Sequence, residues 1–307
     1  MSGAAGGAVF LYGFLYFSTL CRNNCNFCYF RRDNDIERYR KTLPEILDAA
    51  ERLVDSGVHV VDLTTGEDPF LHEDGFEFFC TCVREVKART GAAVMASPGV
   101  IPPEAVKKLA GAGVDFFALY QETHNRDLYA KLRQGQDYDE RMDCKRLARE
   151  AGMLVEEGVL LGVGETEEDI AHSLDEMGRI GASQIRAMSF VAQPGTPMEG
   201  LGDADDSREI RLIGQMRARY PDKLIPASID VAGVAGIRDR LLAGANVVTS
   251  IIPPASGLKG VAHADLEIDE GTRTVAGVTA VLDSLGMRVA TKAEFENAVS
   301  ALKRKNR

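Results

Sequence analysis

The sequence lacks tryptophan, and only six of its 307 residues are cysteine. Sparse cysteine argues against a small secreted protein held by disulfides, and the N-terminal segment MSGAAGGA lacks the basic start of an export signal. No apolar run reaches the roughly 20 residues that a membrane-spanning helix needs. The longest run, around residues 8–20, is too short and too aromatic. These absences predict a protein of the reducing cytoplasm that has no membrane partner.

Basic residues are also in the minority. Lys and Arg number 36 against 46 Asp and Glu, which leaves a formal net charge of −10. Because a phosphate backbone selects basic surfaces, this balance argues against a nucleic-acid partner. Hydrophobic residues make up 45% of the chain, ample for the core of one large domain or two small ones. Since no linker or low-complexity segment interrupts the chain, we expect a single domain over residues 1–307.

Apolar and β-branched runs of strand length recur along the chain, with amphipathic helical patterns between them. Eight strands alternating with helices in about 250 residues are typical of a (β/α)8 barrel of the TIM type. The alternative is an open doubly wound sheet, but no G-x-G-x-x-G turn follows the first strand. Two further helices, at 272–286 and 291–306, are predicted to close the barrel. The predicted strands are residues 11–19, 59–66, 93–99, 115–122, 155–164, 184–193, 223–230 and 246–252.

Half of the cysteines lie in one short polar loop after the first predicted strand. Cys21, Cys25 and Cys28 occur in the run CRNNCNFC, a C-x3-C-x2-C spacing that lets three thiolates face one inorganic centre. A [4Fe–4S] cluster normally has four cysteine ligands, and the next cysteine is distant, at Cys80. Three thiolates would leave one iron open for chemistry, as an open coordination position does in catalytic zinc sites.

Two other interpretations of this loop fit less well. Structural zinc sites usually add a second cysteine pair or histidines downstream, whereas the five histidines of this chain are scattered singly. A disulfide framework conflicts with the small number of cysteines. The loop therefore predicts an iron–sulfur cluster. The other cysteines, Cys80, Cys82 and Cys144, fall in helical patterns, where a free cysteine behaves as a small apolar residue.

The loop, with aromatic Phe27 just before Cys28, resembles the signature of the radical S-adenosylmethionine (SAM) enzymes. This resemblance implies a TIM-type barrel and two cofactors, a [4Fe–4S] cluster and SAM. In that superfamily the open iron binds the amino and carboxylate groups of SAM. Reductive cleavage of SAM then leaves a 5′-deoxyadenosyl radical, which abstracts hydrogen from a substrate.

Four charged residues stand inside otherwise apolar predicted strands, toward the same end of the barrel: Asp62, Glu122, Arg186 and Asp230. Buried charges are costly unless they are paired or used, and barrel enzymes place their sites at the C-terminal ends of the strands. Ion pairs among the four are one explanation. The other is a ligand with two ammonium groups and one carboxylate, since arginine binds carboxylates through its two-pronged guanidinium. That description fits a basic amino acid such as lysine.

Over nearly its whole length the chain resembles the methylornithine synthases, the radical SAM mutases that open pyrrolysine biosynthesis. The similar segments include VDLTTGEDP, LYQETHNRDLYAKLRQGQ, IRAMSFVAQPGTPMEG and LIPASIDVAGVAGIRDRLLAGANVVTSIIPP. This resemblance implies isomerisation of L-lysine to (3R)-3-methyl-D-ornithine, with an electron donor such as flavodoxin or ferredoxin. The family carries a longer N-terminal helical extension than the few residues that precede the first strand here.

The resemblance also implies roles for individual residues. Arg186 and Ser228 are expected to bind the substrate carboxylate, Asp230 its α-amine and Asp62 its side-chain amine. A second group is expected around SAM: Phe27, Tyr29, Ser97, Glu122, Arg141 and Asp68. Asp68 belongs to the turn GEDP, where it replaces the glutamate that is usual in the superfamily.

Two alternatives remain at this point. One is another radical SAM enzyme of the biotin-synthase or hydrogenase-maturase type, acting on a small substrate similar to an amino acid. The other is an iron–sulfur electron carrier. A carrier needs no amino-acid anchors, so the charges at the strand ends argue against it.

Overall fold

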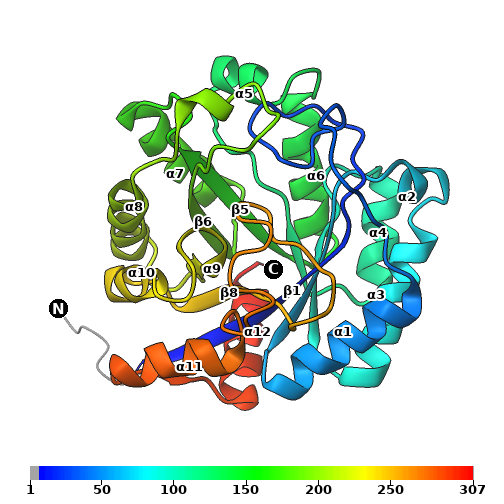
Figure 1. Cartoon of the computed structure of the whole chain (residues 1–307), viewed down its shortest axis with the longest axis vertical. Coiled ribbons are helices and arrows are strands. Elements are labelled where there is room, and N and C mark those ends of the chain that lie inside the picture. The colour runs from blue at the N-terminus through cyan, green and yellow to red at the C-terminus, as the bar shows by residue number, and fades with distance from the viewer. Residues whose placement is uncertain (1–6, 307) are drawn as a thin grey trace.

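Eight parallel strands form the centre of the protein (Figure 1). The computed structural model describes residues 7–306. The strands pair in the order β6-β5-β4-β3-β2-β1-β8-β7. This arrangement confirms the predicted barrel and excludes an open doubly wound sheet. The strands are β1 (Ala8–Ser18), β2 (Val60–Thr65), β3 (Ala93–Ser97), β4 (Phe116–Ala118), β5 (Leu154–Leu161), β6 (Gln184–Ser189), β7 (Pro226–Ser228) and β8 (Val247–Ile251).

The barrel is closed only at the N-terminal ends of its strands. There the Ile185 amide donates to the Leu224 carbonyl at 3.0 Å, and the Leu224 amide donates to the Ser183 carbonyl at 3.1 Å. Within residues 7–306, β6 and β7 form no further ladder toward their C-terminal ends. The contact between β6 and β7 is therefore short, and the barrel is nearly closed.

Helices form a layer outside the strands (Figure 1). Their ends follow the local chemistry: the carboxylate of Glu45 accepts from the Thr42 amide at 2.7 Å before the first helix, and Gly57 ends that helix at φ 107°. The helices of this layer are α1 (Leu43–Ser56), α2 (Pro69–Glu73), α3 (Glu77–Thr90), α4 (Pro103–Ala112), α5 (Arg126–Leu132), α6 (Tyr138–Glu150), α7 (Glu167–Arg179), α8 (Asp206–Arg219), α9 (Ile229–Ala232), α10 (Ile237–Ala243) and α11 (Val275–Ser284), with a 3-10 turn, η1, at Glu199–Leu201.

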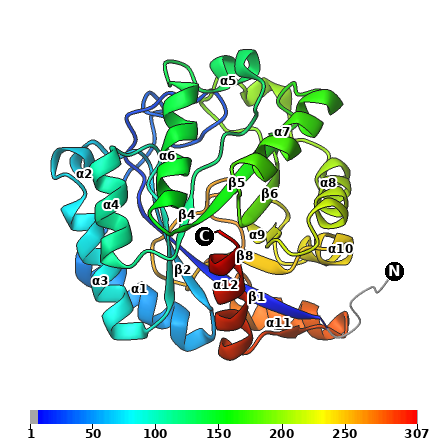
Figure 2. The ribbon, with the colours of Figure 1, turned by 180° about the vertical axis from the view of Figure 1, so that it is seen from behind.

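The C-terminal helix α12 (Lys292–Lys305) covers the N-terminal end of the barrel (Figure 2). Its Phe295 ring lies 5.4 Å from the ring of Phe10 and 6.5 Å from that of Phe116, measured between centroids. The short strand β9 (Arg288–Val289) pairs with the start of β1 just before this helix. Apolar side chains thus fill the barrel at the N-terminal ends of its strands. Space for a ligand is left at the C-terminal ends.

Every predicted strand runs past its observed C-terminal end; the predicted strand 184–193, for example, ends at Ser189. Two of these errors change the setting of a predicted site residue. The predicted strand 223–230 ends at Ser228, because the hydroxyl of Ser228 accepts from the Asp230 amide at 3.2 Å and caps α9. Asp230 is therefore a helical residue. The predicted strand 115–122 ends at Ala118, and Glu122 turns into the left-handed region at φ 67°.

The three cysteines outside the loop are buried in the helical layer, Cys80 and Cys82 in α3 and Cys144 in α6. Burial raises the pKa of Cys82 to about 12 and that of Cys144 to about 11. These thiols are packing residues, as predicted. Within the described residues, no helix combines the length and the apolar character that crossing a membrane requires.

Candidate active site

The cysteine loop leaves β1 and crosses the end of β2, where two backbone bonds hold it. The Gly66 amide donates to the Ser18 carbonyl at 2.9 Å, and the Arg22 amide donates to the Glu67 carbonyl at 3.0 Å. A Cβ atom at Gly66 would lie 2.3 Å from the Leu20 carbonyl oxygen. Only glycine allows this approach, which explains the first residue of the GEDP turn.

The thiols of Cys21, Cys25 and Cys28 are free. Burial raises the pKa of Cys28, and the charges of Cys25 and Cys21 raise it further. Gln136 Nε2 donates to the Cys25 sulfur at 3.0 Å, and Arg133 Nη1 donates to it at 3.4 Å. Two N–H groups are therefore directed at one sulfur atom of the loop.

One cavity at the C-terminal ends of the strands joins this loop to the predicted substrate residues. The loop contributes Cys28, Phe27 and Tyr29 to its walls. From the barrel come Asp62, Glu122, Arg186, Ser228 and Asp230. Most of the residues predicted from the strand ends therefore meet in one place.

Arg186 crosses the barrel interior from β6. Its Nε donates to Glu156 Oε1 at 2.7 Å and its Nη1 to Thr249 Oγ1 at 3.1 Å, while the guanidinium lies 5.6 Å from the Tyr120 ring centroid. Among residues 7–306 no group accepts from its Nη2. Because Arg186 lines the cavity, this nitrogen remains available to a ligand carboxylate.

Asp62 faces Arg186 from the opposite wall, because β2 and β6 are four strands apart in a ring of eight. Its Oδ1 accepts from the hydroxyls of Ser97 at 2.8 Å and Thr64 at 3.1 Å. In the part of the chain that the structure describes, Oδ2 has no donor and Asp62 has no cationic partner. Burial raises the pKa of Asp62 to about 6, against the bond from Ser97, and the charge of Glu156 adds to the rise. This carboxylate is suited to accept an ammonium group.

Asp230 has partners of its own. It forms an ion pair with Arg273, and its Oδ2 accepts from the amides of Val261 at 2.9 Å and Ala262 at 2.7 Å. It thus holds in place the segment at Val261 and Ala262, which lines the cavity. Ser228 contacts Ser250 through their hydroxyls at 3.1 Å. That these two residues bind the substrate stays a prediction.

Similarity to known proteins agrees with this geometry. A family model described as the radical SAM superfamily matches residues 15–177. The 3-methylornithine synthase of Methanosarcina barkeri is 44% identical over 95% of this chain and 83% of its own length. A crystal structure of methylornithine synthase superposes with a TM-score of 0.90 at 43% identity, covering 95% of this chain and 86% of that one.

The chain belongs to the radical SAM superfamily and, within it, to the 3-methylornithine synthase family. A more distant relative is the [FeFe] hydrogenase maturase subunit HydE of Thermotoga maritima, 31% identical over 79% of this chain and 70% of the relative. A [4Fe–4S] cluster and SAM are characteristic of radical SAM proteins. The three free thiols on one loop and the N–H donors at Cys25 fit such a cluster.

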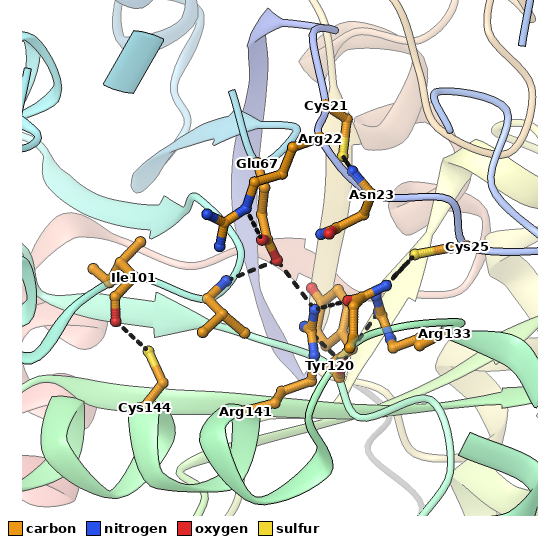
Figure 3. A network of polar contacts seen from close by, with 12 residues as sticks. Cys21, Arg22, Asn23, Cys25, Glu67, Ile101, Tyr120, Arg133, Arg141 and Cys144 are labelled. Atoms are coloured by element: carbon orange, nitrogen blue, oxygen red, sulfur yellow. Dashed lines mark hydrogen bonds and ion pairs between the residues drawn. The ribbon is translucent and has the colours of Figure 1, made fainter. Parts of the chain in front are cut away.

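Arg141, one of the residues predicted to hold SAM, belongs to a polar network beside the cysteine loop that also contains Glu67 and Tyr120 (Figure 3). Glu122 pairs with Arg133 at 2.6 Å, and burial raises the pKa of Glu122 against the opposing charges of Arg133 and Arg141. Arg141 donates to Glu67 at 3.3 Å and to the Tyr120 carbonyl at 3.3 Å. Burial opposes ionisation of Glu67, but Arg141 and the Val100 amide hold its pKa below the ordinary value.

Three of the predicted SAM residues, Ser97, Asp68 and Arg141, do not line the cavity and have structural partners instead. Ser97 donates to Asp62, as described above. Asp68 caps α2 by accepting from the Phe70 amide at 3.1 Å, and it also accepts from Arg40 at 2.7 and 2.8 Å and from Ser18 at 2.6 Å. With both oxygens occupied, Asp68 stabilises the turn, and its position lends no support to direct contact with SAM.

Sequence reasoning missed the partners of the site residues. These are Glu156, Arg273, Arg133, Gln136 and Glu67. A signal existed for one of them, because Glu156 stands in the strand VEEGVLL, where a charge is as costly as at Arg186. For the others, which lie in loops or turns, only the fold brings them to the site.

Proposed function

We propose that this protein is a 3-methylornithine synthase, a radical SAM mutase that isomerises L-lysine to (3R)-3-methyl-D-ornithine and thereby supplies the first intermediate of pyrrolysine biosynthesis. The observation that carries this proposal is the placement of Arg186 and Asp62 on opposite walls of one cavity that also contains Cys28. A substrate with a carboxylate at one end and an ammonium group at the other would be stretched between them. Lysine has that distribution of charge.

The three loop cysteines would hold the cluster, and Glu122 and Arg141 would bind the amino-acid part of SAM. When bound, cluster and SAM supply the 5′-deoxyadenosyl radical that removes hydrogen from the substrate. The chain itself provides binding and orientation. Arg186, fixed by Glu156, would anchor the carboxylate through its Nη2, and Asp62 would accept from the side-chain ammonium.

The walls between these anchors are apolar. Phe14, Leu160, Met188, Phe190 and Val191 line the cavity. A mutase that breaks and remakes a carbon–carbon bond must retain both fragments and exclude water. Enclosure of this kind can contribute on the order of 7–11 kcal/mol through proximity alone. The apolar walls would serve this purpose, while the polar ends fix the fragments' orientation.

The cluster also needs a source of single electrons. We propose a small reduced carrier such as flavodoxin or ferredoxin, acting in a reducing cytoplasm that keeps the free thiols reduced.

The leading alternative is a reaction of the biotin-synthase or hydrogenase-maturase type. A biotin-synthase mechanism needs a second cluster held from the barrel strands. Cys80, Cys82 and Cys144 are buried in α3 and α6, in the outer layer, and are unsuited to that task.

The decisive experiment is anaerobic reconstitution followed by incubation with SAM, a reductant and uniformly ¹³C,¹⁵N-labelled L-lysine. The expected product has the mass of labelled lysine, keeps every label, and separates from lysine by chromatography after derivatisation. Arg186→Ala, with the cluster retained, is the matched control and should form none. Formation of 5′-deoxyadenosine without a lysine isomer would contradict the proposal.

A further inference from the structure

The segment between α5 and α6 reaches the cysteine loop with two side chains. Gln136 Nε2 lies 3.0 Å from the sulfur of Cys25. Arg133 Nη1 lies 3.4 Å from the same sulfur (Figure 3). Cys25 is the least exposed of the three loop cysteines, at 6%. By contrast, the amide of Asn23 approaches the sulfur of Cys21 at 3.5 Å. The side-chain donors are thus concentrated on one thiol.

The local fold explains why both side chains point the same way. Helix α5 ends at Leu132, and its last carbonyls are tied to the loop, since the Asn26 amide donates to Leu132 at 2.8 Å and the Asn26 side chain donates to Lys131 at 2.7 Å. The chain then turns through Gly135 at φ 73°, and the Gln136 amide donates back to the Arg133 carbonyl at 3.1 Å. This turn brings both residues to the loop.

Each donor is held by a second partner as well. Arg133 pairs with Glu122 at 2.6 Å, and its guanidinium lies 5.3 Å from the Phe27 ring centroid. The side-chain oxygen of Gln136 accepts from Arg141 at 2.9 Å. Because these contacts orient the two side chains independently of the sulfur, the N–H groups are aimed at Cys25 in advance.

We infer that Arg133 and Gln136 are positioning residues for the cluster, which raise its reduction potential through hydrogen bonds to the Cys25 thiolate. Reduction adds one electron to the cluster and its sulfur ligands, so donors at sulfur and a nearby cation stabilise the reduced form more than the oxidised form. Burial of this contact strengthens it, because little water screens the charge. The inference depends on the cluster shared by the superfamily and is independent of the substrate.

The test is a redox titration of the reconstituted protein, monitored by electron paramagnetic resonance and carried out without SAM. Gln136→Leu removes one donor and leaves the Arg133–Glu122 pair in place. At a fixed solution potential, the ratio of reduced to oxidised cluster should fall about tenfold, the effect of one charge-assisted hydrogen bond. Arg133→Met should lower the ratio further, and Arg133→Lys should restore part of it.

Gln134→Leu is the matched control, since Gln134 is exposed in the same turn and the change has the same chemistry. It should titrate like the parent. Iron and sulfide content are measured for every variant. An unchanged ratio in Gln136→Leu at full iron content would overturn the inference. So would loss of the cluster from both Gln136→Leu and Arg133→Lys, because that result would assign the two residues a purely structural role. Neither outcome bears on lysine turnover, so this inference can fail while the proposed function stands.

Discussion

Arg186 of β6 and Glu156 of β5 form an ion pair inside the barrel, with Nε and Oε1 2.7 Å apart. Glu156 is fully buried, and its Oε2 has no hydrogen-bond partner in the described structure. The pair fixes the guanidinium in the cavity wall and compensates its charge when no ligand is bound. Breaking such a pair leaves an isolated buried charge, which is why both residues are expected to be essential for orientation.

Arg186→Ala is expected to abolish lysine isomerisation while the absorption spectrum of the cluster stays unchanged. Arg186→Lys keeps the charge but loses the forked geometry, so it should lower kcat/KM for lysine on the order of 100-fold. Steady-state product formation and iron content check both. Loss of the cluster in either variant would mean that Arg186 supports the cluster site and not the substrate.

The raised pKa of Asp62 predicts that kcat/KM for lysine decreases at acidic pH. Burial raises its pKa from 3.8 to about 6, so below that pH the carboxyl is protonated and a poorer acceptor for ammonium. The kcat/KM for lysine should fall as the pH drops through about 6, measured by product formation between pH 5 and 8. Asp62→Asn should be slow at every pH and lack this fall. If Asp62→Asn showed the same fall in kcat/KM at low pH, the fall would belong to another ionisable group.

The same shift has a consequence for stability. In the pH range from 3.8 to about 6 the folded protein retains a proton that the unfolded chain has lost, so the contribution of Asp62 to stability falls as the pH rises through this window and stays low above it. Asp62→Asn should therefore raise the Tm at pH 8, as measured by thermal unfolding. A lower Tm in Asp62→Asn would show that its bonds from Ser97 and Thr64 outweigh the cost of burial.

Cys25→Ser is expected to remove the cluster, because a hydroxyl is a poor iron ligand beside two thiolates. Iron analysis and the visible spectrum after anaerobic reconstitution measure this. Cys144→Ser is the matched control, since Cys144 is buried in α6 with only a weak contact from its sulfur to the Ile101 carbonyl at 3.7 Å. It should retain the cluster. Equal iron content in the two variants would refute the assignment of Cys25 as a cluster ligand.

Gly66→Ala should disturb the cysteine loop. The added methyl group would lie 2.3 Å from the Leu20 carbonyl oxygen and 2.8 Å from the Cβ of Cys21, so backbone must move. We expect a lower Tm and less iron per chain. Gly111→Ala, in α4 with no atom within 4 Å of the new Cβ, is the control and should stabilise the protein by about 0.5–1 kcal/mol. Full iron content in Gly66→Ala would show that the loop can shift freely.

Much of the architecture was predictable because it is periodic. Eight apolar runs with helical patterns between them specify a barrel, and the caps at Thr42 and Gly57 specify the ends of one helix. The ends of β4 and β7 were not predictable from periodicity. They are decided by Glu122 turning to positive φ and by Ser228 capping α9.

The sequence by itself determined the chemistry of the centre, since three cysteines within eight residues are brought together by chain connectivity alone. It also showed four charged residues in otherwise apolar segments, whose burial has to be compensated: Asp62, Glu122, Arg186 and Asp230. Only the tertiary structure decided their partners. Arg186 meets Glu156 from 30 residues away, Asp230 meets Arg273 from 43, and Cys25 meets Arg133 from 108. No local pattern encodes such contacts, because they depend on which strand ends the nearly closed barrel places around one cavity.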